Sequence, residues 1–227
     1  RYNNVPLCHI QGGEVSGNTD HYVRNAITQL ADLHLVATER SAQRVKTMLR
    51  SHHAPVYVTG CPSIDLCQRT TPSAELPIMA LYHPDTNVNG TVNREALAVV
   101  RKLRGDVTRW YGPNIDPGND EITQAVGHWN DEPDQFLARL AGTQCLVGNS
   151  SAGIREASYF GTPVVNIGQR QQGRERAENV MEVGYDIDEI RHAIDKQVAH
   201  GPYESSDLYG RGDAGTRIAE RVAAWLN

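Results

Sequence analysis

A turn of small polar residues follows a short apolar run in the second half of the chain. Residues 145–147 form the apolar run, Gly148, Asn149, Ser150 and Ser151 follow it, and the next nine residues have helix-forming character. This order predicts a strand, a turn and a helix, with two hydroxyl groups and backbone N–H groups at the strand end. Because a helix N-terminus also attracts negative charge, the turn suits a phosphate ester.

A second polar loop adds positive charge. Residues 164–167 are predicted to form a buried parallel strand, and the loop after this strand contains Arg170 and Arg174. Ligands of open parallel sheets bind outside the carboxyl ends of the strands, so both loops should face one crevice. Glu156 would be unfavourable beside a phosphate unless hydroxyl groups donated hydrogen bonds to it, and a ribose offers two. The pattern therefore favours a nucleotide over free phosphate.

Ordinary structural roles are the alternative for these residues. Serines before a helix are common N-caps, and an arginine in a polar loop is usually a solvated surface residue. The convergence of hydroxyl groups, a helix terminus, a carboxylate and two arginines at neighbouring strand ends favours a ligand site.

Four sequence runs resemble one protein family. In chain order they are H-I-Q-G-G-E-V-S-G, V-T-G-C-P-S-I-D, G-N-S-S-A-G-I-R-E-A and G-T-P-V-V-N-I-G-Q-R-Q-Q-G-R-E. Together they resemble the UDP-N-acetylglucosamine 2-epimerase family, and within it the hydrolysing branch that makes N-acetylmannosamine for sialic acid synthesis. The resemblance covers nearly the whole chain.

The resemblance implies two Rossmann-like domains of the glycosyltransferase-B type that face each other across a cleft. Alternation of strands and helices independently predicts an α/β fold with parallel sheets. We expect residues 1–70 to form the later part of the N-terminal domain and residues 71–227 to form the UDP-binding domain with a closing helix. Strand ends that family members carry upstream of the first matching run do not occur here, so the first domain is expected to be incomplete at its N-terminus.

The predicted strands and helices alternate along the chain. Strands are expected at residues 5–10, 33–37, 56–59, 77–81, 109–112, 145–147, 164–167 and 179–183, and helices at 21–30, 39–50, 93–103, 133–141, 188–199 and 214–226. In the first helix Val23, Ala26, Ile27 and Leu30 have the spacing of a core face, and Asp20 is placed as its N-cap.

The resemblance assigns three residues to the sugar side of the site. Asp20 and Glu14 are expected to be catalytic carboxylates, and Arg24 follows Asp20 by one helical turn. Their structural alternatives are a helix N-cap for Asp20, a solvated loop residue for Glu14 and a surface ion pair for Arg24.

Other residues are assigned to the nucleotide. His83, in an H-P-x-T motif that ends at Thr86, is expected to be catalytic and to hold the pyrophosphate together with Arg170 and the hydroxyl groups of Ser150 and Ser151. Glu156 is expected to bind the ribose. Three further residues complete the expected substrate-binding set, and the backbone at residues 130–133 is expected to contact the uracil. The three are Asn114 of an N-I-D-x-G loop, Asn149 and Arg174.

The implied reaction inverts the carbon that bears the acetamido group of a UDP-sugar. A carboxylate removes the proton there while positive groups carry the charge that develops on the departing pyrophosphate. Water then adds to the unsaturated glycal and gives N-acetylmannosamine. No cofactor and no metal are expected.

The chain departs from the family pattern at two positions. His21 and Asn25 stand where the family usually reads Glu and His in D-E-x-x-R-H, whereas Gln11 replaces a Glu of non-hydrolysing relatives and so favours the hydrolysing branch. The departures leave open another nucleotide-activated 2-acetamido sugar or weakened catalysis. A truncated or inactive UDP-sugar-binding module and a glycosyltransferase of the same architecture are further alternatives.

Composition is that of a globular enzyme. The 227 residues are 39% hydrophobic and 22% charged, with a net charge of −5, which argues against nucleic acid or an anionic membrane as the partner. The longest apolar runs are shorter than the ~20 residues needed to span a bilayer. The four cysteines have no metal-like spacing and are expected to be reduced and buried. We therefore expect a cytoplasmic enzyme, and the resemblance implies a homodimer.

Overall fold

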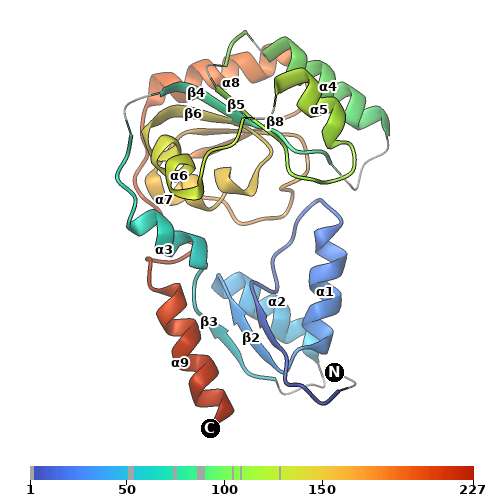
Figure 1. The fold of residues 1–227 in the computed structure, drawn as a ribbon, viewed down its shortest axis with the longest axis vertical. Helices are drawn as coiled ribbons and strands as arrows, with labels where there is room; N and C mark the ends of the chain where they lie inside the picture. Colours follow the sequence, from blue (N-terminus) through green and yellow to red (C-terminus); the bar gives the residue numbers. More distant parts are fainter. Residues whose placement is uncertain are drawn as a thin grey trace.

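The structure is a computed structural model that describes residues 3–50, 54–73, 76–85, 90–103, 105–107, 109–127 and 129–227. It contains two separate parallel sheets, one above the other in Figure 1. The smaller sheet has the order β1-β2-β3. Its elements are β1 (Cys8–Ile10), α1 (Asp20–Leu30), β2 (Leu33–Val36), α2 (Glu39–Leu49) and β3 (Val56–Val58).

The larger sheet has five strands in the order β5-β4-β6-β7-β8, and all of its pairs are parallel. Its strands are β4 (Leu76–Leu81), β5 (Arg109–Tyr111), β6 (Thr143–Gly148), β7 (Val164–Ile167) and β8 (Val180–Val183). The chain moves outward from β4 to β5 and then returns to the other side of β4 as β6. The strand order therefore reverses between β4 and β6, and such a switch point is where ligands bind in open α/β sheets.

Helices cover both faces of the larger sheet (Figure 1). One core lies between the sheet and α4 (Gly90–Leu103), α5 (Asn119–Val126) and α8 (Ile187–His200). The second core contains residues of α3 (Pro62–Gln68), α6 (Pro133–Gly142) and α7 (Glu156–Phe160). Side chains of β6 alternate between the two cores, because Val147 packs in the first and Leu146 in the second. The sheet is thus buried on both faces, as expected of a parallel sheet.

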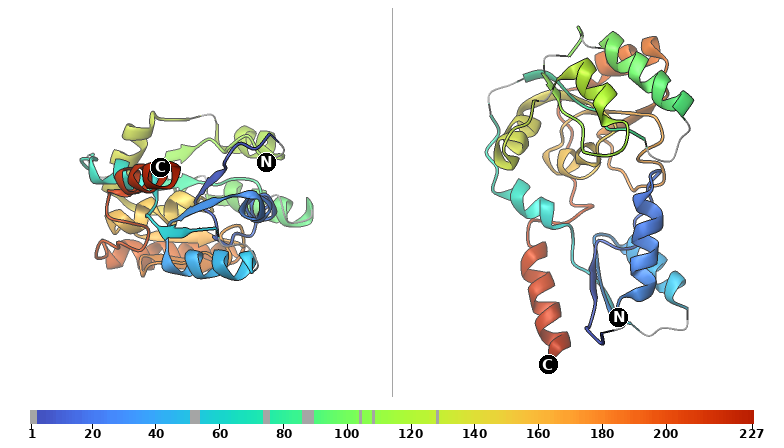
Figure 2. Two further views of the ribbon diagram at one scale, coloured as in Figure 1. Left: turned by 90° about the horizontal axis from the view of Figure 1, so that it is seen from below. Right: turned by 45° about the vertical axis from the view of Figure 1, so that its right-hand side comes forward.

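The last helix, α9 (Ala214–Leu226), returns to the smaller sheet. Asp65 of α3 accepts hydrogen bonds from the backbone N–H groups of Ala214 and Gly215 at 2.9 and 2.7 Å, which fixes the start of the helix. Further along, Arg217 donates to the carbonyl oxygen of Val58 at 2.7 Å, and Arg221 lies over the ring of Tyr57. Figure 2 shows α9 extending away from the larger domain. None of the described helices is long and apolar enough to cross a membrane.

Most predicted elements are confirmed, with boundaries that differ by one to three residues. The helices α3 and α5 were not predicted; both are short, and α3 begins at a proline. The predicted helix after Ser151 is broken into a 3₁₀ turn, Ser151–Gly153, and the five-residue α7. A helix this short contributes little of the predicted helix dipole. Thr86 of the H-P-x-T motif lies outside the described residues.

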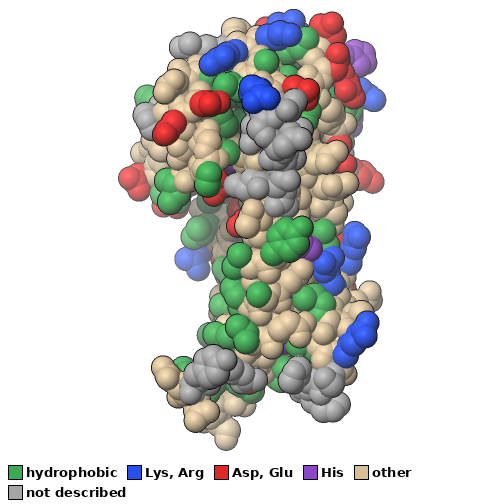
Figure 3. Space-filling model, turned by 90° about the vertical axis from the view of Figure 1, so that its right-hand side faces the viewer, with side chains coloured by type: hydrophobic (Ala, Val, Ile, Leu, Met, Phe, Trp, Pro, Cys, Tyr) green, Lys and Arg blue, Asp and Glu red, His purple; other side chains and the backbone are tan. Residues whose placement is uncertain are grey.

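The predicted orientation of α1 is wrong. Val23, Ile27 and Leu30 are 55%, 36% and 48% exposed, and Ala26 is exposed beside them. The helix instead buries Thr28, whose hydroxyl group lies 3.2 Å from Nδ1 of His9. The face that carries Thr28 therefore turns inward, and its buried hydroxyl group is hydrogen-bonded as expected. Figure 3 views the right-hand side of Figure 1, and it shows hydrophobic side chains gathered on the lower half of the molecule.

The predicted N-cap of α1 is also wrong. Thr19 occupies the N-cap position, and Asp20 is the first helical residue. Its carboxylate accepts a hydrogen bond from the side chain of Asn18 at 2.8 Å. The aspartate is exposed, so it stays available to a ligand.

Replacement of Gly148 by alanine should destabilise the fold. Gly148 has φ +145°, and a Cβ there would lie 2.0 Å from the carbonyl oxygen of Leu81 on β4. We expect the free energy of unfolding to fall by about 2 kcal/mol, measured by urea denaturation. Gly105→Ala is the matched control, because a Cβ at Gly105 meets nothing within 4 Å. Equal stability of the two variants would contradict the expectation.

Candidate functional site

Asn149 joins the carboxyl ends of β4 and β6. Its side-chain oxygen accepts from the backbone N–H of His83 at 2.7 Å, and its side-chain nitrogen donates to the carbonyl oxygen of His83 at 2.8 Å. Asn149 itself is buried at 1% exposure. These paired hydrogen bonds fix the chain after each strand, so they fix the geometry at the switch point.

The imidazole of His83 is held in one tautomer. Its Nδ1 accepts a hydrogen bond from the backbone N–H of Asn114 at 3.0 Å, so the proton of the neutral ring is on Nε2. Burial, and secondarily the charge of Arg170, lowers the pKa of His83 from 6.5 to about 4. The ring is therefore a neutral hydrogen-bond donor at neutral pH.

Arg170 lies behind the same junction. Its guanidinium donates to the carbonyl oxygen of Asn149 at 3.3 Å and lies 3.5 Å from the carboxylate of Asp116. The side-chain amide of Gln171 donates to the same carbonyl oxygen at 2.7 Å. Burial lowers the pKa of Arg170, although Asp116 opposes this effect. A buried cation beside a neutral histidine can stabilise negative charge on a ligand.

Ser150 and Ser151 have different partners. The hydroxyl oxygen of Ser150 accepts from the backbone N–H of Ala152 at 3.3 Å, which is the ordinary capping role. The hydroxyl group of Ser151 accepts from Arg155 at 3.2 Å. The same guanidinium donates to the side-chain oxygen of Gln11 at 3.3 Å and so connects the two halves of the molecule.

Glu156 is buried, at 8% exposure. Its carboxylate lies 3.9 Å from Nε of Arg155, and its Oε2 has no hydrogen-bond partner among the described residues. Burial raises the pKa of the Cys67 thiol to about 12, and the nearby charge of Glu156 adds to this rise. Oε2 of Glu156 is therefore a buried acceptor without a donor. A buried acceptor of this kind costs free energy unless a donor reaches it.

Residues assigned to the sugar side come from the loop after β1 and from α1. Glu14 makes a 2.9 Å ion pair with Arg174, and both side chains are buried. Arg24 donates to the carbonyl oxygen of Glu14 at 3.1 Å and to the hydroxyl group of Ser16 at 3.2 Å. Asp20 raises the pKa of Arg24 through its charge, although burial gives a net lowering. The expected carboxylates and arginines thus lie in one charged cluster.

The two halves touch at backbone level. The N–H of Gly17 donates to the carbonyl oxygen of Arg170 at 2.9 Å. A Cβ at Gly17 would lie 2.0 Å from the carbonyl oxygen of Gln169, so only glycine allows this approach. The loop that carries Glu14 therefore packs directly on the loop that carries Arg170 and Arg174.

Sequence reasoning did not single out Arg155 or Asp116. Arg155 is adjacent to Glu156 in a quoted motif, but its partner Gln11 is 144 residues away. Although burial acts to lower the pKa of Arg155, Glu156 and other nearby groups raise it overall. Asp116 was quoted only as part of the N-I-D-x-G loop, where its position two residues after Asn114 was the available signal.

The cysteines are largely buried and form no disulfide with one another. Cys61, Cys67 and Cys145 are buried and Cys8 is partly buried, and all four are free thiols. Among the described residues, no group of three histidine, cysteine or acidic side chains is placed to hold a metal ion.

Comparison with known proteins gives a consistent result. A family model described as UDP-N-acetylglucosamine 2-epimerase matches residues 1–223. The chain is 31% identical over 246 residues to a UDP-N-acetylglucosamine 2-epimerase of Neisseria meningitidis, with 97% of this chain and 64% of that protein covered. It is 30% identical over 239 residues to a hydrolysing UDP-N,N'-diacetylbacillosamine 2-epimerase of Legionella pneumophila, with 94% and 63% covered.

The fold has matches among solved structures. The structure of a UDP-N-acetylglucosamine 2-epimerase of Methanocaldococcus jannaschii, in complex with UDP-GlcNAc and UDP, superposes with a TM-score of 0.78 at 11% identity. The superposition covers 98% of this chain and 70% of that one. The predicted architecture of two Rossmann-like domains of the glycosyltransferase-B type is confirmed, and the chain spans about two thirds of the length of these proteins.

His83 should remain neutral until the solution is strongly acidic. Protonation of Nδ1 would remove the acceptor of the Asn114 N–H, and burial opposes the charge, so we expect a pKa of about 4 with the Nε2–H tautomer at neutral pH. Long-range ¹H–¹⁵N NMR of the folded chain measures both quantities. The urea-unfolded chain is the control and should titrate near 6.5. Titration of folded His83 near that ordinary value would contradict the expectation.

Proposed function

Because the chain belongs to the UDP-N-acetylglucosamine 2-epimerase family, we propose that it is a hydrolysing UDP-N-acetylglucosamine 2-epimerase, which releases UDP and N-acetylmannosamine. One observation carries the proposal. His83, Asn149 and Arg170 meet at the switch point of the larger sheet, and the loop with Glu14 packs against them. Donors suited to a diphosphate thus gather at the edge of the sheet, next to the loop that carries an acidic group suited to the sugar.

On the nucleotide side, the donors have defined roles in this proposal. Nε2–H of His83 and the guanidinium of Arg170 hold the pyrophosphate and stabilise the charge that it gains on departure. Ser150 and Ser151 provide hydroxyl groups at the same edge. Oε2 of Glu156, which has no hydrogen-bond partner among the described residues, accepts from a ribose hydroxyl group. The backbone N–H of Asn114 and the side-chain amide of Asn149 position His83.

On the sugar side, one carboxylate is better placed as the base. Glu14 is engaged with Arg174, whereas Asp20 is exposed at the start of α1. Asp20 removes the proton from C2, the C–H electrons form the C1=C2 double bond, and the C1–O bond breaks with its electron pair leaving on UDP. Water then adds its hydroxyl group to C1 and a proton returns to C2. Glu14 and Arg24 orient the sugar.

A related substrate is the first alternative. The Legionella relative is named for N,N'-diacetylbacillosamine, so the family includes a further 2-acetamido sugar. His21 and Asn25 support this alternative, because they alter α1 beside Asp20 and Arg24. A UDP-sugar-binding module without turnover is the second alternative.

The proposal extends to the oligomeric state and the compartment. We propose a homodimer, supported by the apolar stripe of α1 in which Tyr22 and Val23 are 67% and 55% exposed. Such a stripe is more often covered by protein than left in water. Sedimentation equilibrium that gives the monomer mass would contradict the dimer. A cytoplasmic location is supported by the four free thiols. The division at residues 70 and 71 is likewise proposed, since the two sheets lie on either side of it.

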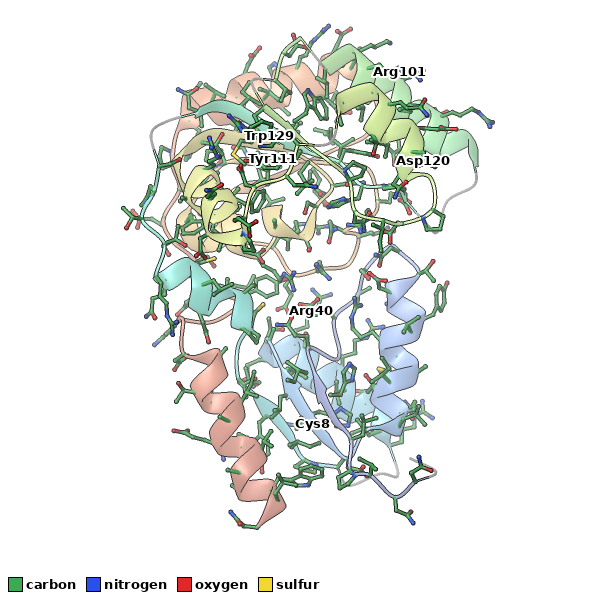
Figure 4. The ribbon with its side chains drawn as sticks, viewed as in Figure 1. Cys8, Arg40, Arg101, Tyr111, Asp120 and Trp129 are labelled. Atoms are coloured by element: carbon green, nitrogen blue, oxygen red, sulfur yellow. The ribbon has the colours of Figure 1, made fainter. Side chains whose placement is uncertain are left out.

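Loss of Arg170 should weaken UDP binding. Arg170→Gln removes a buried, charge-assisted donor, so we expect the dissociation constant for UDP to rise at least about tenfold in calorimetry. Arg101→Gln is the matched control, because Arg101 is exposed on α4, far from the switch point (Figure 4). Circular dichroism checks that both variants fold. Equal UDP affinity of the two variants would remove Arg170 from the site.

Turnover tests the reaction itself. Incubation with UDP-N-acetylglucosamine in D₂O should give UDP and N-acetylmannosamine with deuterium at C2, detected by NMR. Asp20→Asn should lower the rate by about 100-fold or more, with UDP affinity changed less than threefold. Folded protein that binds UDP and forms no product would support the binding module instead. Product without deuterium at C2 would reject the proposed proton abstraction.

A further inference from the structure

A cavity of about 200 Å³ lies between the two halves of the molecule, beside the Glu14–Arg174 ion pair. The loop after β1, the first turns of α2 and the loop after β7 each contribute to it. Its charged lining residues are Glu14, Arg40, Arg44, Arg174 and Glu175. In Figure 4, Arg40 lies centrally, between the smaller sheet and the larger domain. The cavity is thus a junction of both halves and not part of one sheet.

The two carboxylates of the lining are already in use. Glu14 pairs with one nitrogen of Arg174 at 2.9 Å. Glu175 accepts a hydrogen bond from the hydroxyl group of Thr38, at the N-terminus of α2. The carbonyl oxygen of Glu175 is also taken, since it accepts from the hydroxyl group of Tyr209 at 2.8 Å. Oε1 of Glu14 has no hydrogen-bond partner among the described residues, but the lining still holds three guanidinium groups against two carboxylates.

Several guanidinium N–H groups have no acceptor. In the part of the chain that the structure describes, neither Arg40 nor Arg44 has a carboxylate within ion-pair distance. Nε of Arg44 and both Nε and Nη1 of Arg174 are buried without a hydrogen-bond partner. Arg174 is only 8% exposed. Unsatisfied buried charged donors are costly, and an anion is the ligand that removes the cost.

The neighbouring histidine does not change the charge balance of the cavity. His21 lies near Arg44, and burial followed by the charges of Arg44 and Arg24 lowers its pKa. It therefore stays neutral at neutral pH and leaves the positive surplus in place. Three guanidinium groups against two engaged carboxylates favour a ligand with at least one negative charge.

We propose that this cavity is an oxyanion site for one phosphate or carboxylate group. Planar guanidinium groups match both oxyanions through paired N–H donors. The volume is smaller than the ~300–1,000 Å³ of pockets that hold whole drug-sized ligands, so the site takes a single group and not a nucleotide. Its lining includes Glu14 and Arg174 but not His83, Asn149 or Arg170, which are proposed for the pyrophosphate. The oxyanion is either a free ion or an acidic substituent on the sugar, and only the second source rests on the proposed function.

The test uses inorganic phosphate as the probe and the full chain as the protein. Calorimetry should show phosphate binding to the wild type, with the dissociation constant raised at least about tenfold in Arg44→Gln and in Arg40→Gln. Lys46→Gln is the matched control: it lies on the same helix and makes the same change of charge, but Lys46 lines a different groove. We expect its affinity for phosphate to stay within twofold of the wild type. Thermal melting establishes that each variant is folded.

Competition separates this site from the nucleotide site. Saturating UDP should leave phosphate binding unchanged. Absence of phosphate binding, equal losses in Lys46→Gln and Arg44→Gln, or displacement of phosphate by UDP would overturn the proposal. If the chain binds no UDP, the proposed function fails while the phosphate titration still decides the oxyanion site.

A second titration identifies the source of the oxyanion. UDP-N-acetylglucosamine is compared with its C6 carboxylate analogue on the wild type and on Arg44→Gln. Tighter binding of the carboxylate analogue, lost in Arg44→Gln, assigns the site to an acidic sugar. Equal affinity for the two nucleotide sugars, together with phosphate binding, assigns it to a free anion.

Discussion

The geometry of this protein depends on a backbone contact between its halves. Gly17 donates to the carbonyl oxygen of Arg170, and it lies so close to Gln169 that no side chain fits. A contact of this kind leaves little room for either loop to shift. It brings Glu14 within 2.9 Å of Arg174. An acidic residue of the first half therefore lies directly against an arginine of the second half.

Positive charge is concentrated where the halves meet. Burial lowers the pKa of Arg24, and the charge of Arg174 lowers it further. Burial likewise lowers the pKa of Arg170. Guanidinium groups that repel one another in a dry space are stabilised by an anion more than by a neutral ligand. A ligand with a diphosphate would thus reduce the electrostatic cost of keeping the halves together, and its binding would stabilise the folded chain.

Sequence patterns predicted the site better on strands than on helices. The small residues after β6 and the arginines after β7 follow buried strands, and the rule for carboxyl ends of parallel strands correctly placed Asn149 beside Arg170. The spacing rule failed for α1. Thr28 is buried beside His9, and the apolar stripe of the helix is exposed. Spacing records which residues share a face. It does not show which face of a helix packs against the neighbouring elements.

The two departures from the family pattern are a single local change. His21 and Asn25 lie one turn apart on α1, and their side chains are 3.1 Å from each other. The family pattern has an acidic residue at the first position, where it would lie near Arg44; a neutral imidazole occupies it here. The substitution therefore removes a negative charge from the neighbourhood of a guanidinium while the helix keeps a polar pair at the same place. A change of this kind alters the charge beside Arg44 while the helix itself is kept, so it acts on local electrostatics and not on the architecture.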